Sequence, residues 1–172
     1  TGLGDPIAYD IRQAGFEVLQ YACGDHDENG VDFEVVYQPA AYKGGQVTYE
    51  SFSALKVLDS YRKRNPSITT RSIKVDLRRL DSLLATHAPD VRTIDILTID
   101  VEGWELEVLA GLSLQSYRPA VVILENLHDD ARYGAYMRVQ GYRLHLSMNP
   151  NEIYVPVEPS IRAKRRRWRR VS

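Results

Sequence analysis

The stretch that decides the fold runs from Ile94 to Gly111 and reads IDILTIDVEGWELEVLAG. Residues 94–99 are mostly branched and apolar, which predicts a buried strand interrupted only by Asp95 and Thr98. Apolar residues then recur at helical spacing, so a helix with one buried face follows; this face is formed by Trp104, Val108 and Leu112. A strand that leads into a helix is the repeating unit of α/β proteins.

The segment downstream repeats this unit and then departs from it. Residues 119–124 are nearly all apolar, as expected of a central parallel strand, and a helix over 131–139 ends at Gly141. Strands predicted over 142–146 and 152–157 have only a short turn between them. Parallel neighbours need a long crossover, so we expect these two strands to be antiparallel.

The segment upstream is less regular. We expect a short helix over 7–14 that ends at Gly15, and a strand over 16–22. Residues 31–37 alternate between apolar and acidic side chains, the pattern of a half-buried strand. Residues 39–49 contain a glycine pair and are predicted to form a loop.

Two further helices are predicted before the deciding stretch. Apolar side chains share one helical face before Asn65-Pro66 ends the first helix; they are Phe52, Leu55, Leu58 and Tyr61. A strand at Ile73 and Val75 follows. Asp76 is then expected to cap a second helix, which has Leu77, Leu80 and Leu84 on one side.

Strands that alternate with helices predict the fold class. We expect an α/β protein with a doubly wound, mostly parallel sheet that ends in an antiparallel hairpin. The strands near 17–22, 94–99 and 120–124 should be parallel to one another. Residues 1–160 are expected to form one domain, followed by a basic tail over 161–172.

The charge of the chain is distributed unevenly. Of its 22 lysines and arginines, seven lie in residues 161–172, which contain no acid. The 15 remaining cations face 23 acids, which leaves residues 1–160 with a net charge of −8. An acidic body argues against a nucleic-acid-binding face on the domain. Two interpretations of the tail stay open: a solvated end, or a contact with phosphate, an anionic surface or an acidic partner.

The composition also limits the cellular setting. No apolar run approaches 18 residues, so we expect no membrane span. Cys23 is the only cysteine, which excludes an intrachain disulfide and favours a reducing compartment. No secretory leader opens the chain. We therefore expect a cytoplasmic protein.

Acidic residues follow three of the predicted strands. Asp25 comes after the first strand, Asp100 and Glu102 come after 94–99, and Glu125 ends 119–124 with His128 just beyond. Ligands of open α/β sheets bind outside the carboxyl ends of the strands, so these acids are candidates for a functional site. The alternative is that Asp100 and Glu102 only stabilise the start of the following helix.

Several segments together resemble the methyltransferase family of the FkbM type. The long central signature is residues 94–111, preceded by LDSL at 80–83. The shorter matching pieces are YACGD at 21–25, VVILE at 121–125, GY at 141–142 and NEIYV at 151–155. The resemblance covers roughly residues 16 to 157, and its central signature is specific.

This resemblance implies an S-adenosylmethionine-dependent methyltransferase, with a hydroxyl of a small molecule or sugar as the expected acceptor. It places Asp25, with Cys23 and Gly24 before it, at the adenine amine, because a carboxylate accepts a hydrogen bond from that group. Asp100 matches the acid beside the sulfonium of the cofactor.

The resemblance also indicates candidate catalytic residues. Asp100 and Glu102 are expected to orient or deprotonate the acceptor hydroxyl, with Glu125 and His128 as further members of the site. Methyl transfer from a sulfonium mainly needs in-line positioning and a deprotonated nucleophile. The three acids also carry the oxygen ligands that a hard divalent cation prefers, but we expect no resident metal.

The chain departs from the family pattern in two places. Thr98 stands where the family has lysine, two residues before Asp100. The first strand with its glycine loop is not found, so we expect the domain to be incomplete at its amino end. Gly4 and Asp5 are the candidates for the end of that loop and for the acid that binds the ribose hydroxyls. The alternative function is a non-catalytic binding module that keeps the fold and docks through the basic tail.

Overall fold

The computed structural model describes residues 15–36, 41–42, 45–46, 53–64, 66 and 68–157. Three predictions concern residues outside these ranges and remain predictions. They are the helix over 7–14, the candidates Gly4 and Asp5, and the basic tail over 161–172. Every helix in the described part of the chain is too short or too polar to cross a membrane.

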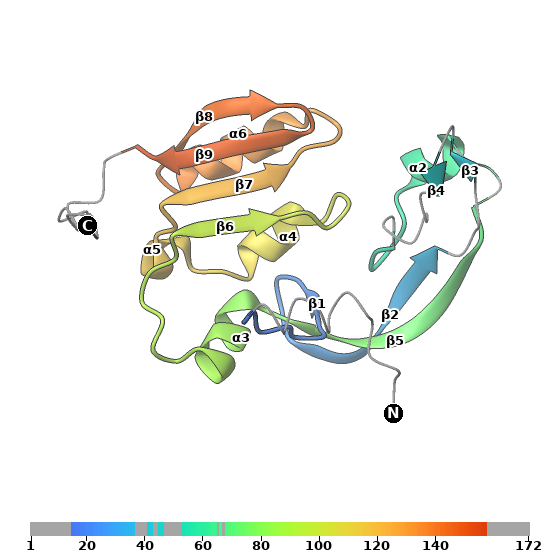
Figure 1. Ribbon diagram of the computed structural model, residues 1–172, viewed down its shortest axis with the longest axis horizontal. Coiled ribbons are helices and arrows are strands. Elements are labelled where there is room, and N and C mark those ends of the chain that lie inside the picture. The colour runs from blue at the N-terminus through green and yellow to red at the C-terminus, as the bar shows by residue number, and fades with distance from the viewer. Residues whose placement is uncertain are drawn as a thin grey trace, which may run out of the picture.

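The carboxyl-terminal half forms a four-stranded sheet (Figure 1). Its order is β6 (Ile96–Ile99), β7 (Val121–Glu125), β9 (Asn151–Pro156) and β8 (Tyr142–Met148). β6 and β7 are parallel, while β9 is antiparallel to both β7 and β8. The predicted central strands and the closing hairpin are therefore confirmed.

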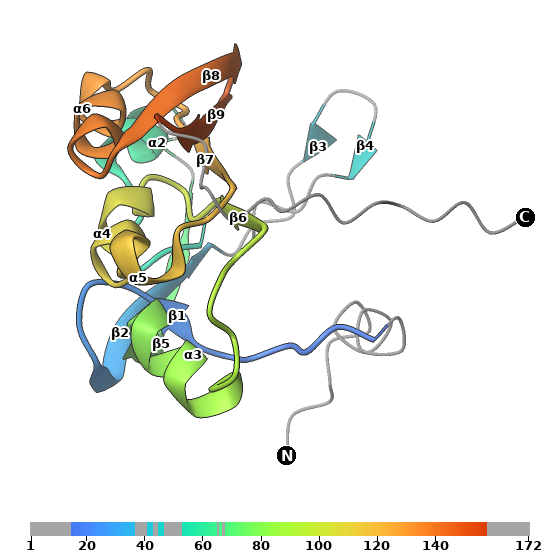
Figure 2. The same cartoon turned by 90° about the vertical axis from the view of Figure 1, so that its left-hand side faces the viewer.

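One face of this sheet carries the helices (Figure 2). These are α4 (Glu105–Ala110), α5 (Leu114–Tyr117) and α6 (Ala131–Val139). The strongly apolar runs seen in the sequence supply the interface, where Val108 and Leu109 of α4 meet Val122 and Leu124 of β7. Each of these side chains is at most 2 % exposed, and burying one contributes about 1.5–3 kcal/mol.

The amino-terminal half forms a second sheet, which corrects two predictions. Its order is β1 (Ala22–Cys23), β5 (Thr70–Arg78) and β2 (Glu28–Val36), with β1 parallel and β2 antiparallel to β5. The strand predicted over 16–22 is wrong apart from its last residue, because the first strand in the described part of the chain, β1, begins at Ala22. β1 also pairs with β5 and not with β6, so parallel pairing of all three predicted strands is not found among the described residues.

The prediction of one mostly parallel sheet is therefore only partly correct. Among the described strands, two pairs are parallel and the other four are antiparallel. The reason is the pairing of β2 with β5, which form a long curved ribbon (Figure 1). The alternating pattern of β2 fits a strand with one half-buried face, which an antiparallel partner satisfies directly.

Helix α3 (Leu80–His87) is capped differently from the prediction. Asp76 lies inside β5, where its carboxylate accepts a hydrogen bond from the backbone N–H of Gly30 at 3.1 Å. The cap comes instead from Asp27, whose carboxylate accepts from the N–H of Arg79 at 2.7 Å and from the Ser82 hydroxyl at 2.6 Å. A distant residue thus replaces the local cap that the sequence suggested.

The predicted helix before Asn65-Pro66 is shorter than expected. α2 covers only Asp59–Arg64, and Ser53–Leu58 is not helical. The cause lies in Glu34 of β2, whose carboxylate accepts the N–H of Val57 at 2.6 Å and pairs with Arg62 at 2.8 Å. These contacts, together with the backbone bridge between Glu34 and Ala54, hold the segment beside β2 until α2 begins. Two short antiparallel strands, β3 (Ala41–Tyr42) and β4 (Gly45–Gln46), precede it in the chain.

The two sheets meet where α4 ends. A Cβ on Gly111 would lie 2.0 Å from the carbonyl oxygen of Gly24 and 3.3 Å from the Cα of Arg79. No side chain fits in that space, so glycine is required by close approach of the two backbones. The same junction includes the bond from the N–H of Asp81 to the Gly111 carbonyl at 3.0 Å. It fixes the end of β1 against the helical layer of the other sheet.

Candidate active site

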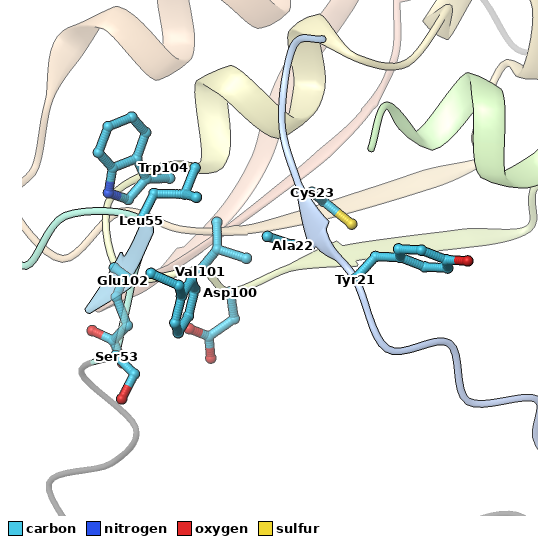
Figure 3. Close-up of a pocket in the computed structure, with 11 residues that line it drawn as sticks. Tyr21, Ala22, Cys23, Ser53, Leu55, Asp100, Val101, Glu102 and Trp104 are labelled. Atoms are coloured by element: carbon cyan, nitrogen blue, oxygen red, sulfur yellow. The ribbon is translucent and has the colours of Figure 1, made fainter. Parts of the chain in front are cut away.

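The carboxyl ends of β1 and β6 border a cavity of about 390 Å³. Figure 3 shows Tyr21, Ala22 and Cys23 on one side of it, Leu55 and Trp104 on the other, and Asp100 between them. The remaining lining residues are Phe33, Ser53, Ala54, Val101 and Glu102. The cavity combines an apolar wall with carboxylates at one edge, which suits a ligand that is partly flat and apolar and partly cationic.

Three carboxylates converge beside this cavity. Carboxylate oxygens of Asp100, Glu102 and Glu125 all lie within 4.8 Å of one another. Asp100 and Glu102 follow β6, and Glu125 ends β7, so the parallel pairing of these strands brings the three together. The prediction that acids from separate strands meet at one sheet edge is confirmed for these three residues. Carboxylate oxygens are the ligand type that a hard divalent cation prefers, but such a cation takes about six or more ligands.

Glu125 is the member whose protonation is most altered. Burial raises its pKa to about 7, and the negative charges of Asp100 and Glu102 act in the same direction. A hydrogen bond with Asp100 and the charge of Glu105 contribute further. Its Oε2 atom is buried and has no hydrogen-bond partner among the described residues. Glu125 therefore changes its charge near neutral pH, where a general base is most effective.

The loop that carries Glu102 has an unusual backbone. Glu102 and Gly103 both have positive φ angles, 59° and 98°. A Cβ on Gly103 would lie 2.6 Å from the Cδ1 atom of Leu58, so the loop also packs tightly against the segment before α2. Trp104 adds a hydrogen bond from its indole N–H to the Lys56 carbonyl at 3.2 Å. The loop is thus held in a conformation that few residues adopt freely.

The start of α4 bears on the alternative that Asp100 and Glu102 stabilise this helix. The cap position of α4 is Trp104, and no side chain caps the helix there. Glu105, the first residue of α4, instead accepts hydrogen bonds from the backbone N–H groups of Val101 and Gly103. Asp100 and Glu102 line the cavity, and stabilisation of α4 through the helix dipole stays open as a second interpretation.

Glu105 is the structural residue of this site that sequence reasoning passed over. Its side chain is 0 % exposed, and its second oxygen accepts a hydrogen bond from the Tyr133 hydroxyl at 2.5 Å. The sequence contains a signal for a buried acid, because Glu105 interrupts an apolar helical face inside the central signature. Its partner Tyr133 lies 28 residues away on α6, which sequence spacing does not reveal.

The predicted cofactor residues at the end of β1 lie in different settings. Cys23 lines the cavity, and burial raises the pKa of its thiol. Gly24 is buried, and a Cβ there would lie 2.9 Å from the Leu77 side chain. Asp25 is exposed and is not among the cavity-lining residues.

Asp25 belongs to a small charged cluster at the end of β1. The Nδ1 atom of His26 lies 2.6 Å from the Asp25 carboxylate, and its Nε2 atom lies 3.2 Å from the Glu28 carboxylate. The hydrogen bond to His26 lowers the pKa of Asp25, and the two acids raise the pKa of His26. Asp25 is consequently ionised at neutral pH and able to accept a hydrogen bond from an amine.

His128 lies at a second cavity, of about 380 Å³, and not among the three carboxylates. Its Nε2 atom is 3.4 Å from the Ser60 hydroxyl of α2. Gly103 and Tyr133 line the same cavity, so it adjoins the other side of the Glu102 loop. Asp130 and Arg132 are also present but pair with each other at 2.6 Å.

Comparison with known families matches residues 7–144 to the methyltransferase FkbM domain. Neither the curated proteins nor the solved structures include a significant match to the chain. The matched range contains β6, the Glu102 loop and β7, which hold the three converging carboxylates. Membership implies a Rossmann-like methyltransferase fold and the use of S-adenosylmethionine. Because the match spans most of the sequence, the chain belongs to the FkbM methyltransferase family.

Proposed function

We propose that this protein transfers the methyl group of S-adenosylmethionine to a hydroxyl oxygen of a small molecule or sugar. The observation that carries the proposal is the convergence of Asp100, Glu102 and Glu125 within 4.8 Å at the edge of a cavity. Methyl transfer to a hydroxyl needs a group that removes or holds the hydroxyl proton. A carboxylate cluster with one member titrating near neutrality meets that need.

The cavity residues fit the cofactor that the family uses. Apolar side chains such as Phe33 and Leu55 suit the adenine ring, and the acidic edge suits the cationic sulfonium. We assign cofactor binding to Cys23, Gly24, Asp25 and Asp100, with Asp25 directed to the adenine amine. When bound, S-adenosylmethionine supplies an electrophilic methyl group.

The residues of the chain would then act on the acceptor. The acceptor hydroxyl would donate its one proton in a hydrogen bond to Glu125, while the charges of Asp100 and Glu102 beside the sulfonium would help to bring the two reacting groups into line. Glu125, whose pKa lies at about 7, takes up the hydroxyl proton as the oxygen forms its new bond to carbon. His128, which lines the second cavity 3.4 Å from the Ser60 hydroxyl, would hold a more distant part of the acceptor.

The proposal is tested by incubating the protein with S-adenosylmethionine labelled in the methyl group and a panel of hydroxyl compounds, including methyl glycosides and simple alcohols. We expect label in an acceptor, and the label should survive mild alkali because methyl ethers are stable there. Label that alkali releases would indicate a carboxyl methyl ester and overturn the hydroxyl assignment. Binding of S-adenosylhomocysteine without transfer to any acceptor would favour the non-catalytic binding module.

A further inference from the structure

We infer that Glu105 is a positioning residue of the active site, whose buried carboxylate sets the conformation of the loop that carries Asp100 and Glu102. The effect of Glu105 on methyl transfer rests on the proposed function, whereas its contacts with the loop do not. Glu105 is absent from the cavity lining and from the carboxylate cluster. It therefore acts through the loop and not by touching the acceptor.

The burial of Glu105 needs an explanation. Among the described residues, it is the one charged side chain in the buried set, and it is 0 % exposed. A buried carboxylate is costly unless several donors satisfy it. Three donors do so here: two backbone N–H groups from the loop and one hydroxyl from α6. Because burying the Glu105 carboxylate is costly, we attribute its presence to the loop and the α6 hydroxyl that it holds together.

The arrangement that it holds is the strained part of the loop. Its Oε1 atom accepts from the N–H of Val101 at 3.0 Å and from the N–H of Gly103 at 3.1 Å. These two groups flank Glu102, whose φ angle of 59° is in the left-handed region. Such a conformation persists only where surrounding contacts over-determine it. One carboxylate oxygen thus fixes the Asp100–Val101 and Glu102–Gly103 peptide groups.

The other oxygen connects the loop to a second element. Tyr133 of α6 is 5 % exposed and donates its hydroxyl to the Oε2 atom of Glu105. Burial and this bond raise the pKa of Tyr133, so its hydroxyl stays protonated and remains a donor. Tyr133 and Gly103, which both hydrogen-bond to Glu105, also line the second cavity. The Glu105 network therefore links α6 to the loop.

Glu105 also acts through its charge. Its negative charge adds to those of Asp100 and Glu102 in raising the pKa of Glu125. Replacing Glu105 by glutamine removes the charge but keeps an oxygen acceptor for the loop. Replacing it by alanine removes both. The two substitutions consequently separate the anchoring effect from the electrostatic one.

The test compares Glu105→Gln, Glu105→Ala and Tyr133→Phe with Glu107→Gln, a control on the same helix. Calorimetry measures the Kd for S-adenosylhomocysteine, and carbon-13 NMR follows the titration of the Glu125 carboxyl. We expect Glu105→Ala to weaken binding about tenfold, as for loss of a hydrogen bond to a charged group, with Tyr133→Phe between it and the wild type. Glu105→Gln should restore most of the affinity while Glu125 titrates at lower pH, and the control should change neither.

The outcomes separate this inference from the proposed function. If the wild type binds no S-adenosylhomocysteine, the proposed function fails, and the Glu125 titration still tests the positioning role. If Glu105→Gln and Tyr133→Phe are folded, bind as the wild type does and leave the Glu125 titration unchanged, the inference is overturned. A fall in melting temperature without either change has the same meaning, because a purely structural residue would produce that result.

Discussion

At the scale of single residues, the proposed proton transfer depends on the close approach of three carboxylates, Asp100, Glu102 and Glu125. Glu125 is partly buried beside Asp100 and Glu102, and its pKa rises from 4.5 to about 7. Like charges at this spacing cannot all ionise freely, so one acid keeps its proton longer than the others. Above about pH 7 Glu125 is ionised and can accept the proton that an acceptor hydroxyl loses.

The raised pKa of Glu125 predicts how stability depends on pH. The folded protein holds this proton more tightly than the unfolded chain, so stability should fall as pH rises from about 4.5 to 7. Glu125→Gln removes the repulsion and should raise the melting temperature at pH 8 by about 2–4 °C, the equivalent of roughly 1 kcal/mol after solvent screening. Thermal melts of both proteins at pH 5 and pH 8 measure the effect. An identical difference between the two proteins at both pH values would contradict it.

Asp25 gives a second prediction at this scale. Asp25→Ala should weaken S-adenosylhomocysteine binding about tenfold to a hundredfold, because a charge-assisted hydrogen bond contributes roughly 1.5–3 kcal/mol. Asp90→Ala, in the exposed turn after α3, is the control and should bind normally. Fluorescence or calorimetric titration reports the Kd. Equal affinity of the two folded variants would show that Asp25 has been assigned to the wrong group.

Sequence reasoning found those site residues whose role follows from their place along a strand. Asp100 and Glu125 were predictable because each stands where a buried strand ends. Glu105 was not, because its function depends on Tyr133, a partner that only the packing of α6 brings near. The placement of His128 at a separate cavity was equally hidden.

At the scale of elements, the site depends on where α4 ends. Gly111 lets this helix approach the end of β1 so closely that backbone touches backbone. The contact locates Gly24, and therefore the start of the Asp25 segment, relative to β6. A small change at this junction should consequently affect both stability and the candidate cofactor residues.

Gly111→Ala tests the junction. The added Cβ would lie 2.0 Å from the Gly24 carbonyl oxygen, so the two backbones must separate, at a cost of about 1–3 kcal/mol. Gly134→Ala in α6 is the matched control, since its Cβ would meet atoms no closer than 3.7 Å. Removing a helical glycine there should be neutral or stabilise by about 0.5–1 kcal/mol. Urea unfolding of both variants measures the difference, and a Gly111→Ala protein as stable as the control would refute the account.

Elements were predictable where the pattern was long and local. The strands β6 and β7 and the hairpin of β8 and β9 follow from apolar runs and a short turn. The residues before Ala22 and the segment 53–58 were mispredicted, because their state depends on pairing partners and on Glu34. The cap from Asp27 was likewise not predictable, because Asp27 is distant in the sequence from α3 whereas Asp76 is near it.

At the scale of the whole molecule, the three-stranded and four-stranded sheets of the described residues are joined through α4 and α3. The cavity and the three carboxylates lie where the carboxyl end of one sheet's β1 meets that of the other sheet's β6. An acidic body surrounds this site, since residues 1–160 carry a net charge of −8. A cationic ligand is therefore favoured over an anionic one by the overall field.

The basic tail provides a prediction for the whole chain. Residues 161–172 contain seven cations and Trp168 as their only aromatic side chain, which is too little apolar surface to offset the entropy of ordering. Deleting them should leave the melting temperature unchanged. Scanning calorimetry of the full and shortened chains decides the matter. A drop of several degrees on deletion would mean that Trp168 packs against the domain.

The central claim is that the cofactor binds at the carboxyl end of β6. It is tested most directly by calorimetric titration of S-adenosylhomocysteine into the wild type, Asp100→Ala and Asp95→Ala. Asp100 and Asp95 flank the same strand at its opposite ends. We predict that the wild type and Asp95→Ala bind alike, while Asp100→Ala loses about tenfold to a hundredfold in affinity. Equal binding by the two folded variants, or loss of binding in Asp95→Ala alone, would contradict the claim.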